Sequence, residues 1–144
     1  MFKFFLVNLL ILVTLGCAGP GVYVHESDAS LTETRKAIVK LYGEPRNLSQ
    51  NGREIWTRHM DRKGRILETA KKGKERRYAH IKILGERRPY DILVNVVVEG
   101  QMIDGTYESL GDDEVLAEQL AAEIKKELLK SLENRNIIDD FNAF

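Results

Sequence analysis

The chain has 144 residues, and its 22 lysines and arginines balance 22 aspartates and glutamates, so the formal net charge is zero. A single cysteine excludes an internal disulfide framework. The hydrophobic fraction of 43% and the charged fraction of 31% are those of an ordinary globular chain.

The charges are unevenly distributed along the sequence. Residues 53–88 contain thirteen Lys/Arg and five Asp/Glu, a net charge of +8, whereas residues 91–144 contain four and thirteen, a net charge of −9. This division indicates either a molecule with two oppositely charged faces or two elements that attract each other.

The first seventeen residues have the composition of an export signal. Lys3 supplies a positive charge, Phe4–Leu15 is apolar except for one asparagine and one threonine, and Gly16 and Cys17 follow. A positive amino end, an apolar stretch of about 7–15 residues and a small residue before the cut are typical of a secretory signal. The apolar stretch is shorter than the ~20 residues that span a membrane.

The segment Val13-Thr14-Leu15-Gly16-Cys17 resembles the lipobox of bacterial lipoproteins, in which aliphatic and small residues precede an invariant cysteine. The resemblance implies cleavage before Cys17 by signal peptidase II, a diacylglycerol on its sulfur and acylation, for example with palmitate, of the new amino terminus. Thr14 departs from the pattern, which usually has leucine there, and this bears on processing efficiency. Ala18 stands where an aspartate would retain the protein in the inner membrane, so the resemblance favours the outer membrane.

We therefore expect a signal peptide over residues 1–16, a lipidated tether over 17–21 and a single domain over 22–144. Each buried methylene of an acyl chain contributes ~0.8 kcal/mol, so two or three chains on one residue hold a small protein firmly. Two alternatives are an ordinary cleaved signal that leaves Cys17 without a role, and an uncleaved helical anchor.

The domain begins with a predicted strand at Val22–Val24 and a helix over Leu31–Tyr42. Ser30-Leu31-Thr32-Glu33 has the form of a capping box, and Gly43 followed by Pro45 ends the helix. The apolar residues at helical spacing are Leu31, Ala37, Ile38, Leu41 and Tyr42.

Strand patterns fill the middle of the domain. Arg53–Asp61 reads as a strand, and Arg65–Thr69 pairs back onto it after Gly64. Arg76–Leu84 alternates, with Ala79, Ile81 and Ile83 on one face and Tyr78, His80 and Lys82 on the other. Tyr90–Glu99 is apolar on both faces, which predicts a central strand, and Gln101–Glu108 extends that hairpin.

A second helix is predicted from the acidic cluster Gly111-Asp112-Asp113-Glu114 to about Leu132, ending near Asn134 and Asn136. Its apolar stripe is Leu116, Leu120, Ile124, Leu128 and Leu132. The tail Ile137–Phe144 carries four large apolar residues. We expect the tail to dock on the body, and the alternative is a free binding motif.

The order (β)αββ(β)βα predicts an α+β domain, with one antiparallel sheet of about three to five strands and both helices on one face. Lys/Arg-bearing strand residues would then populate the open face. Over about 25 residues, Thr32–Pro45 and then Gly52–Trp56 resemble the small lipoprotein subunit of the outer-membrane barrel-assembly machine. In that family a helix ending in a Gly-x-Pro-type turn precedes a Trp-bearing strand. The long terminal helix departs from the family, so its function is not carried over.

No motif predicts a catalytic or metal site. His25, His59 and His80 lack the spacing that places two imidazoles on one helical face. Asp112-Asp113 and Asp139-Asp140 fit no calcium loop. A nucleophile elbow, a phosphate loop and a dinucleotide fingerprint are absent from the sequence. We expect a non-enzymatic protein without a cofactor other than the covalent lipid on Cys17.

A run of basic residues is the most suggestive polar feature, and we expect it to form a patch for an anionic partner. Its members are Arg62, Lys63, Arg65, Lys71, Lys72, Lys74, Arg76 and Arg77. For an exported lipoprotein, anionic lipid headgroups or a polyanionic cell-wall polymer are the expected targets, and nucleic acid is not. The alternative is a solvated sheet face and loop kept soluble by charge.

These features predict a membrane-anchored, periplasm-facing lipoprotein that serves as an accessory or binding module in cell-envelope assembly or maintenance. Its partner would be an envelope protein or an anionic polymer. The alternative is a carrier or sensor that holds a lipid or glycan between the helices and the sheet. That alternative requires an apolar cavity under the helix Leu116–Leu132.

Overall fold

The computed structural model describes residues 20–69 and 73–141, and the side chains as far as residue 135. Its elements are β1 (Val22–Ser27), α2 (Leu31–Tyr42), β2 (Asn47–Leu48), β3 (Glu54–Trp56), β4 (Glu75–Leu84), β5 (Tyr90–Gln101), β6 (Tyr107–Asp112) and α3 (Glu114–Phe141). All strand pairs are antiparallel and belong to one sheet. The predicted α+β class is confirmed, with six strands in the sheet.

Strand β5 lies at the centre of the sheet. It pairs with β4 from Asp91 to Gly100 on one side. On the other side β1 covers its first half, with Val22 opposite Val94, and β6 covers its second half, with Val97 opposite Asp112. The order β1-β5-β4-β3-β2, with β6 also on β5, confirms the predicted central position.

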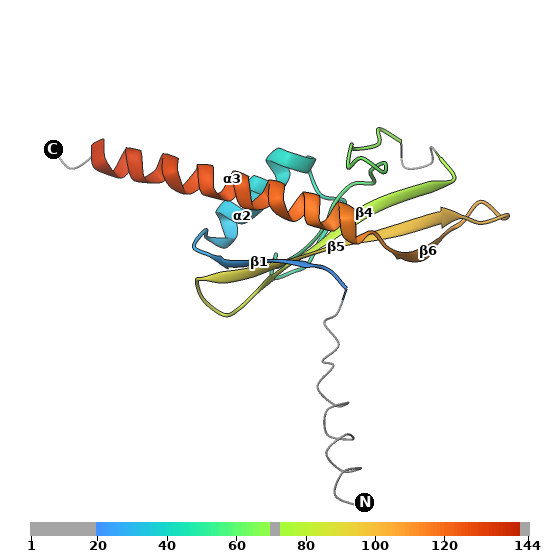
Figure 1. Ribbon diagram of the computed structural model, residues 1–144, viewed down its shortest axis with the longest axis horizontal. Helices are drawn as coiled ribbons and strands as arrows, with labels where there is room; N and C mark the ends of the chain where they lie inside the picture. Colours follow the sequence, from blue (N-terminus) through green and yellow to red (C-terminus); the bar gives the residue numbers. More distant parts are fainter. Residues whose placement is uncertain (1–19, 70–72, 142–144) are drawn as a thin grey trace, which may run out of the picture.

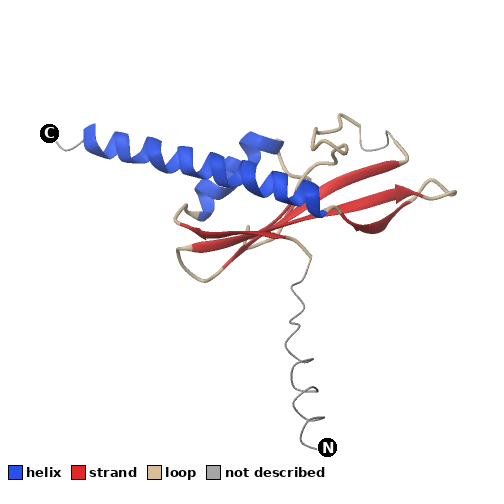
Figure 2. Ribbon diagram, viewed as in Figure 1, coloured by secondary structure: helices blue, strands red, loops and turns tan. Residues whose placement is uncertain are grey.

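Among the described residues, both helices pack on the same face of the sheet, and no described helix covers the other face (Figures 1 and 2). We call the second surface the open face. The apolar residues of β4 and β5 point toward the helices, and the core residues that they contribute are Ala79, Ile81, Ile83, Ile92, Val94 and Val96. Alternation along the two strands therefore places the charged and aromatic residues between them on the open face.

Helix α2 closes one side of the core as predicted. The Ser30 hydroxyl accepts a hydrogen bond from the Glu33 amide at 3.1 Å, and the Ser30 amide donates to the Glu33 carboxylate at 2.7 Å. These two bonds confirm the capping box. The helix ends at Gly43, whose φ of 75° suits glycine and whose amide donates to the Val39 carbonyl.

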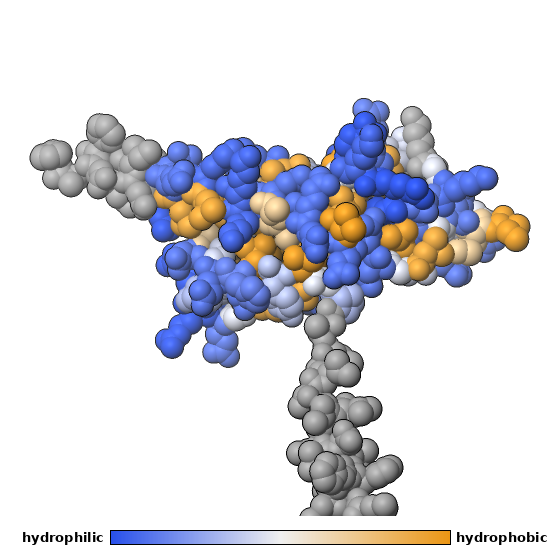
Figure 3. Space-filling view, viewed as in Figure 1, coloured by the Kyte–Doolittle hydropathy of each residue, from blue (hydrophilic) through white to orange (hydrophobic). Residues whose placement is uncertain are grey.

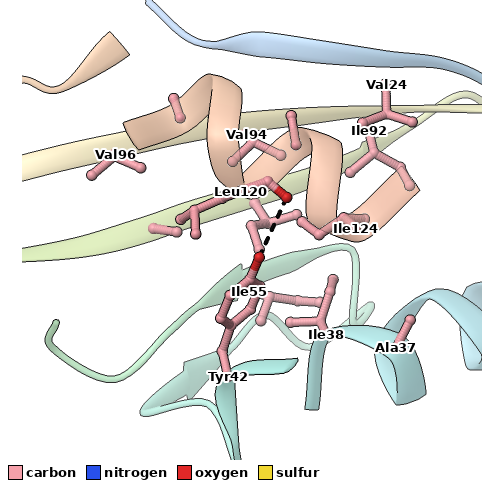
Figure 4. Packing of buried hydrophobic residues seen from close by; sticks show 14 of the residues in the cluster. Val24, Ala37, Ile38, Tyr42, Ile55, Ile92, Val94, Val96, Leu120 and Ile124 are labelled. Carbon is pink, nitrogen blue, oxygen red and sulfur yellow. Dashed lines mark hydrogen bonds between the residues drawn. The ribbon is translucent and has the colours of Figure 1, made fainter. Parts of the chain in front are cut away.

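Tyr42 joins the two helices at the bottom of the core (Figure 4). Its side chain is buried, and its hydroxyl lies 3.3 Å from the Leu120 carbonyl and 3.1 Å from the Glu123 carboxylate. Burial, reinforced by the negative charge of Glu123 and the hydrogen bond to it, raises the pKa of Tyr42 far above its usual value. Tyr42 therefore stays neutral and acts as a donor between α2 and α3.

Helix α3 begins at Glu114, the last residue of the predicted acidic cluster, because Gly111 and Asp112 belong to β6, and it ends later than predicted. The Asp113 carboxylate accepts from the Leu116 amide at 3.0 Å, which satisfies a free donor of the first turn. The predicted stripe is confirmed at Leu116, Leu120, Ile124 and Leu128, which are buried, and Leu132 is half-buried. The predicted end near Leu132 is wrong, since the helix continues to Phe141.

The chain from Glu114 to Phe144 contains neither proline nor glycine, and asparagine alone does not stop a helix. Residues 137–141, which were expected to form a separate docking tail, thus extend α3, and residues 142–144 lie outside the described part. The end of α3 projects past the sheet (Figure 1).

The hairpin of β5 and β6 projects in the opposite direction from the end of α3 (Figure 1). Hydrophobic atoms are visible at its tip (Figure 3), where Ile103 is fully exposed, and Leu110 within β6 is 60% exposed. The expected hairpin extension over Gln101–Glu108 takes the form of a turn followed by β6. The strand expected over Arg65–Thr69 is reduced to one isolated bridge between Met60 and Ile66.

Candidate functional site

The open face carries aromatic rings and charges in place of a helix. The indole of Trp56 stacks on the ring of His80, with 4.5 Å between centroids and 15° between planes. On β1, Tyr23 stacks on His25 at 5.3 Å. The His80 ring also lies 2.8 Å from the Glu54 carboxylate. Trp56 and His80 are thus oriented by neighbours on adjacent strands, whereas Tyr23 and His25 stack within one strand.

A β-bulge shapes the edge of this face directly after β3. The amide of Thr57 donates to the Ala79 carbonyl, and the amide of Met60 donates to the Arg77 carbonyl. Two residues, Arg58 and His59, therefore lie opposite the single residue Tyr78. Such an extra residue bends the strand and redirects its side chains, as is common beside functional sites.

The bulge places His59 in a chain of polar contacts. Its Nε2 lies 3.3 Å from an Arg46 guanidinium nitrogen and 3.3 Å from a Glu99 carboxylate oxygen. Glu99 also pairs with Arg76 at 2.7 Å. The edge of the His59 ring meets the Tyr78 ring at 6.0 Å between centroids. One contiguous network therefore joins the bulge, β4 and β5.

The electrostatic environment keeps His59 neutral at pH 7. Its burial lowers its pKa, the charges of Arg76 and Arg46 lower it further, and the charge and hydrogen bond of Glu99 oppose these effects. The net direction is below the usual value. An uncharged imidazole beside two guanidinium groups acts as a neutral hydrogen-bonding group.

Two hollows adjoin one another around Arg46. The edge hollow, lined by Arg46, Arg58, His59, Leu67 and Glu68, has a volume of about 180 Å³. The face hollow, lined by Arg46, Asn47, Trp56 and Tyr78, has a volume of about 410 Å³. Arg46 stacks over Tyr78, with its guanidinium carbon 4.1 Å from the ring centre. It forms the wall that the two hollows share.

The predicted basic residues are distributed differently from the expected single patch. Arg62 lies 3.3 Å from Glu75, and Arg65 lies 2.7 Å from Asp61. Arg76 stacks on the Tyr107 ring at 3.6 Å in addition to its pair with Glu99. Each of these arginines has a carboxylate partner that offsets its charge.

Arg77 departs from the expectation that the basic strand residues populate the open face. It follows the same alternation as Ala79 and Ile81, so its side chain points toward α3 and is only 7% exposed. Its guanidinium lies 2.7 Å from Asp113 and 2.6 Å from Glu75. Arg77 therefore fastens the start of α3 to the sheet.

The remaining predicted residues are two lysines at the surface and three residues outside the described part. Lys63 and Lys74 are exposed. Cys17, Lys71 and Lys72 lie outside the described residues. The pairs Arg76–Glu99 and Arg77–Asp113 join the basic segment to the acidic one, in agreement with two elements that attract each other.

Sequence reasoning missed Arg46 and Arg58 as members of a site. They stand apart from the dense basic run, and only the bulge and the turn after α2 bring them to one hollow. The Trp56 position was noticed, but its stacking on His80 depends on strand register, which the sequence does not reveal.

Other classes of site find no support in the described residues. Among them no group of three or more His, Cys, Asp or Glu side chains is placed to hold a metal ion. No helix in the described ranges is long and apolar enough to cross a membrane. No protein-family model, curated protein or solved structure matches this chain.

Proposed function

We propose that this protein is a membrane-tethered, non-enzymatic binding module of the bacterial cell envelope, which binds its partner through the open face of the sheet. The observation that carries the proposal is the asymmetry of the sheet. Two helices cover one face with a closed apolar core, whereas the other displays stacked aromatic rings and arginines. Aromatic residues and arginine are enriched at binding surfaces relative to the rest of a protein surface.

The tether is proposed from the lipobox resemblance, with Cys17 as the lipid attachment site. Residues 17–21 precede β1, which begins at Val22. Five extended residues reach at most ~18 Å, so a lipid on Cys17 would keep the domain next to the membrane surface. The partner should therefore be a component of the membrane or of the layer adjoining it.

The carrier alternative has less support from the packing. The cavity between β1 and the second half of α3, lined by Val24, Leu128 and Leu132 among others, holds about 110 Å³. Small-molecule sites usually measure ~300–1,000 Å³. Leu120 and Ile124, in the middle of the proposed cavity wall, are fully buried. The interior between helices and sheet therefore favours a binding module over a carrier.

The tether is tested by intact-mass analysis of the protein extracted from bacterial membranes, with Cys17→Ser as control. We expect a chain that starts at residue 17 and carries the mass of two or three acyl chains. The Cys17→Ser variant should be unmodified. An unmodified wild-type chain in the soluble fraction would contradict the tether.

The binding face is tested by capture from crosslinked membranes with two matched variants. Trp56→Ala/His80→Ala removes the ring stack from the open face, whereas Lys126→Ala/Lys130→Ala changes exposed residues of α3. We expect the first variant to lose the captured envelope component and the second to retain it. Equal capture by both variants would contradict binding through the open face.

A further inference from the structure

The edge hollow contains two arginines that form no ion pair with a carboxylate of the described residues. In the described part of the chain, neither Arg46 nor Arg58 has a carboxylate oxygen within 4.0 Å, unlike Arg62, Arg65, Arg76 and Arg77. Both residues are exposed and both line the same hollow. Both arginines therefore present positive charge to this hollow.

The hollow is also preorganised for an anion. Arg46 has its guanidinium carbon over the Tyr78 ring, 4.1 Å from the ring centre, and a guanidinium nitrogen 3.3 Å from His59. His59 is 8% exposed and is fixed in turn by Glu99. Because the Arg46 head group is already ordered, less side-chain freedom is lost when it binds a ligand.

The size and chemistry of the hollow favour a phosphate group. A guanidinium presents two parallel N–H donors, and two guanidinium groups can share the three terminal oxygens of a phosphate monoester. A carboxylate has only two oxygens for the same donors. Glu68 also lines the hollow, so its charge opposes any anion and sets the affinity below that of an all-cationic site.

The adjoining face hollow would receive the group that carries the phosphate. Trp56 offers an aromatic surface, Asn47 offers amide donors and acceptors, and Arg46 connects this hollow with the first. An apolar ring face together with amide hydrogen bonding suits a sugar ring. The two hollows thus form one site with an anionic end and a ring-binding end.

We propose that the edge hollow and the face hollow together bind a sugar phosphate, with the phosphate on Arg46 and Arg58 and the sugar beside Trp56. This inference rests on the proposed function through the use of the open face, and it adds the chemical class of the ligand. The sugar phosphate would be either a free molecule or the headgroup of a lipid.

Trp56 is the only tryptophan of the chain, so its fluorescence reports directly on the face hollow. We would titrate the full chain in non-ionic detergent with glucose 1-phosphate, and in parallel with glucose and with inorganic phosphate. The test variant is Arg46→Gln/Arg58→Gln. The matched control, Arg62→Gln/Arg65→Gln, removes the same charge from exposed arginines that already have carboxylate partners.

We expect a saturable change in Trp56 emission with glucose 1-phosphate, and weaker binding of glucose and of phosphate alone. Arg46→Gln/Arg58→Gln should weaken binding by about tenfold or more, since charge-assisted hydrogen bonds are lost. The control should change it by less than about twofold. Glu68→Gln should tighten binding by about two- to fivefold, because a like charge is removed. The Glu68→Gln variant keeps the test decisive if the arginine variant does not fold.

A flat titration with glucose 1-phosphate, or equal weakening by both double variants, would overturn the proposal. Phosphate alone binding as tightly as glucose 1-phosphate would overturn the role of the face hollow. Phosphatidylcholine vesicles with and without a monophosphorylated glycolipid distinguish the sources: tighter binding to the glycolipid than to glucose 1-phosphate indicates a lipid headgroup, and equal binding indicates a free ligand. If sugar-phosphate binding is lost while capture through the open face is unchanged, only this ligand class is rejected. The proposed function is then retained.

Discussion

Arg76 and Arg77 are neighbours on β4, but their side chains lie on opposite faces of the sheet. Arg76 lies on the open face between Tyr107 and Glu99, whereas Arg77 points under α3 and pairs with Asp113. One residue of displacement along a strand exchanges the two faces. The comparison teaches that the same basic run makes contacts on both faces of the sheet, since Arg77 fastens α3 to the sheet and Arg76 joins β4 to β5 and β6.

The largest difference between the faces should appear when a core side chain is removed. Ile81→Ala deletes a fully buried side chain from the helix-covered face, and we expect it to lower the free energy of unfolding by about 2–5 kcal/mol. Lys82→Ala, on the open face, should change it by less than about 0.5 kcal/mol. Denaturant unfolding followed by circular dichroism measures both. Similar losses for the two variants would contradict the one-sided core.

The contact between Arg77 and Asp113 should rank next. Asp113→Ala removes the cap of α3 and leaves a buried guanidinium without one of its two partners, so we expect a loss of about 2–4 kcal/mol. Asp112→Ala removes a carboxylate whose bond to Asn95 is exposed and should cost less than about 1 kcal/mol. Equal costs in the same unfolding assay would show that α3 is not fastened through Arg77.

A smaller effect is expected from the hydroxyl that joins the helices. Tyr42→Phe keeps the ring and deletes the donor to Leu120 and Glu123, so the free energy of unfolding should fall by about 0.5–1.5 kcal/mol. Thermal unfolding of the two proteins measures the difference. An unchanged melting temperature would indicate that the hydroxyl contributes nothing beyond the packing of the ring.

The smallest effect concerns His59 on the open face. Burial, followed by the charges of Arg76 and Arg46, holds its pKa below the usual value of ~6.5 in spite of Glu99. Since the folded pKa is lower than the unfolded one, His59 contributes stability above pH ~6.5, and this contribution is lost as the pH falls toward the folded value. A ring-proton NMR titration should show the depressed pKa.

Glu99→Gln should lower the His59 pKa further, because it removes the charge that favours the protonated ring. A Glu99→Gln variant in which His59 titrates at a higher pH than in the wild type would contradict the described network.

The sequence was sufficient for the elements that depend on local signals. The capping box predicted the start of α2, the two apolar faces of Tyr90–Glu99 predicted the central strand, and the leucine stripe predicted the buried side of α3. The end of α3 was not predictable from two asparagines, which only weakly oppose a helix. The prediction of the Cys17 tether is tested by none of these features and stays a prediction.

The candidate site depends on information that local patterns do not contain. The bulge at Arg58 and His59 arises from the pairing of the segment after β3 with β4, so the sequence alone gave no reason to connect Arg58 with Arg46. The basic run attracted attention in the sequence because its lysines and arginines lie close together. The structure shows that four of its arginines pair with carboxylates: Asp61 and Glu75 lie in or beside the run itself, whereas Glu99 and Asp113 come from the acidic part of the chain.

The most direct test of the open face as the binding surface is site-specific photo-crosslinking in living bacteria. A photoreactive residue would replace Lys82 on the open face or Lys126 on the exposed side of α3 in the full-length protein. We predict a discrete crosslinked product from position 82 that depends on Cys17, and none from position 126. Crosslinking from position 126 alone, or equally from both positions, would contradict the account.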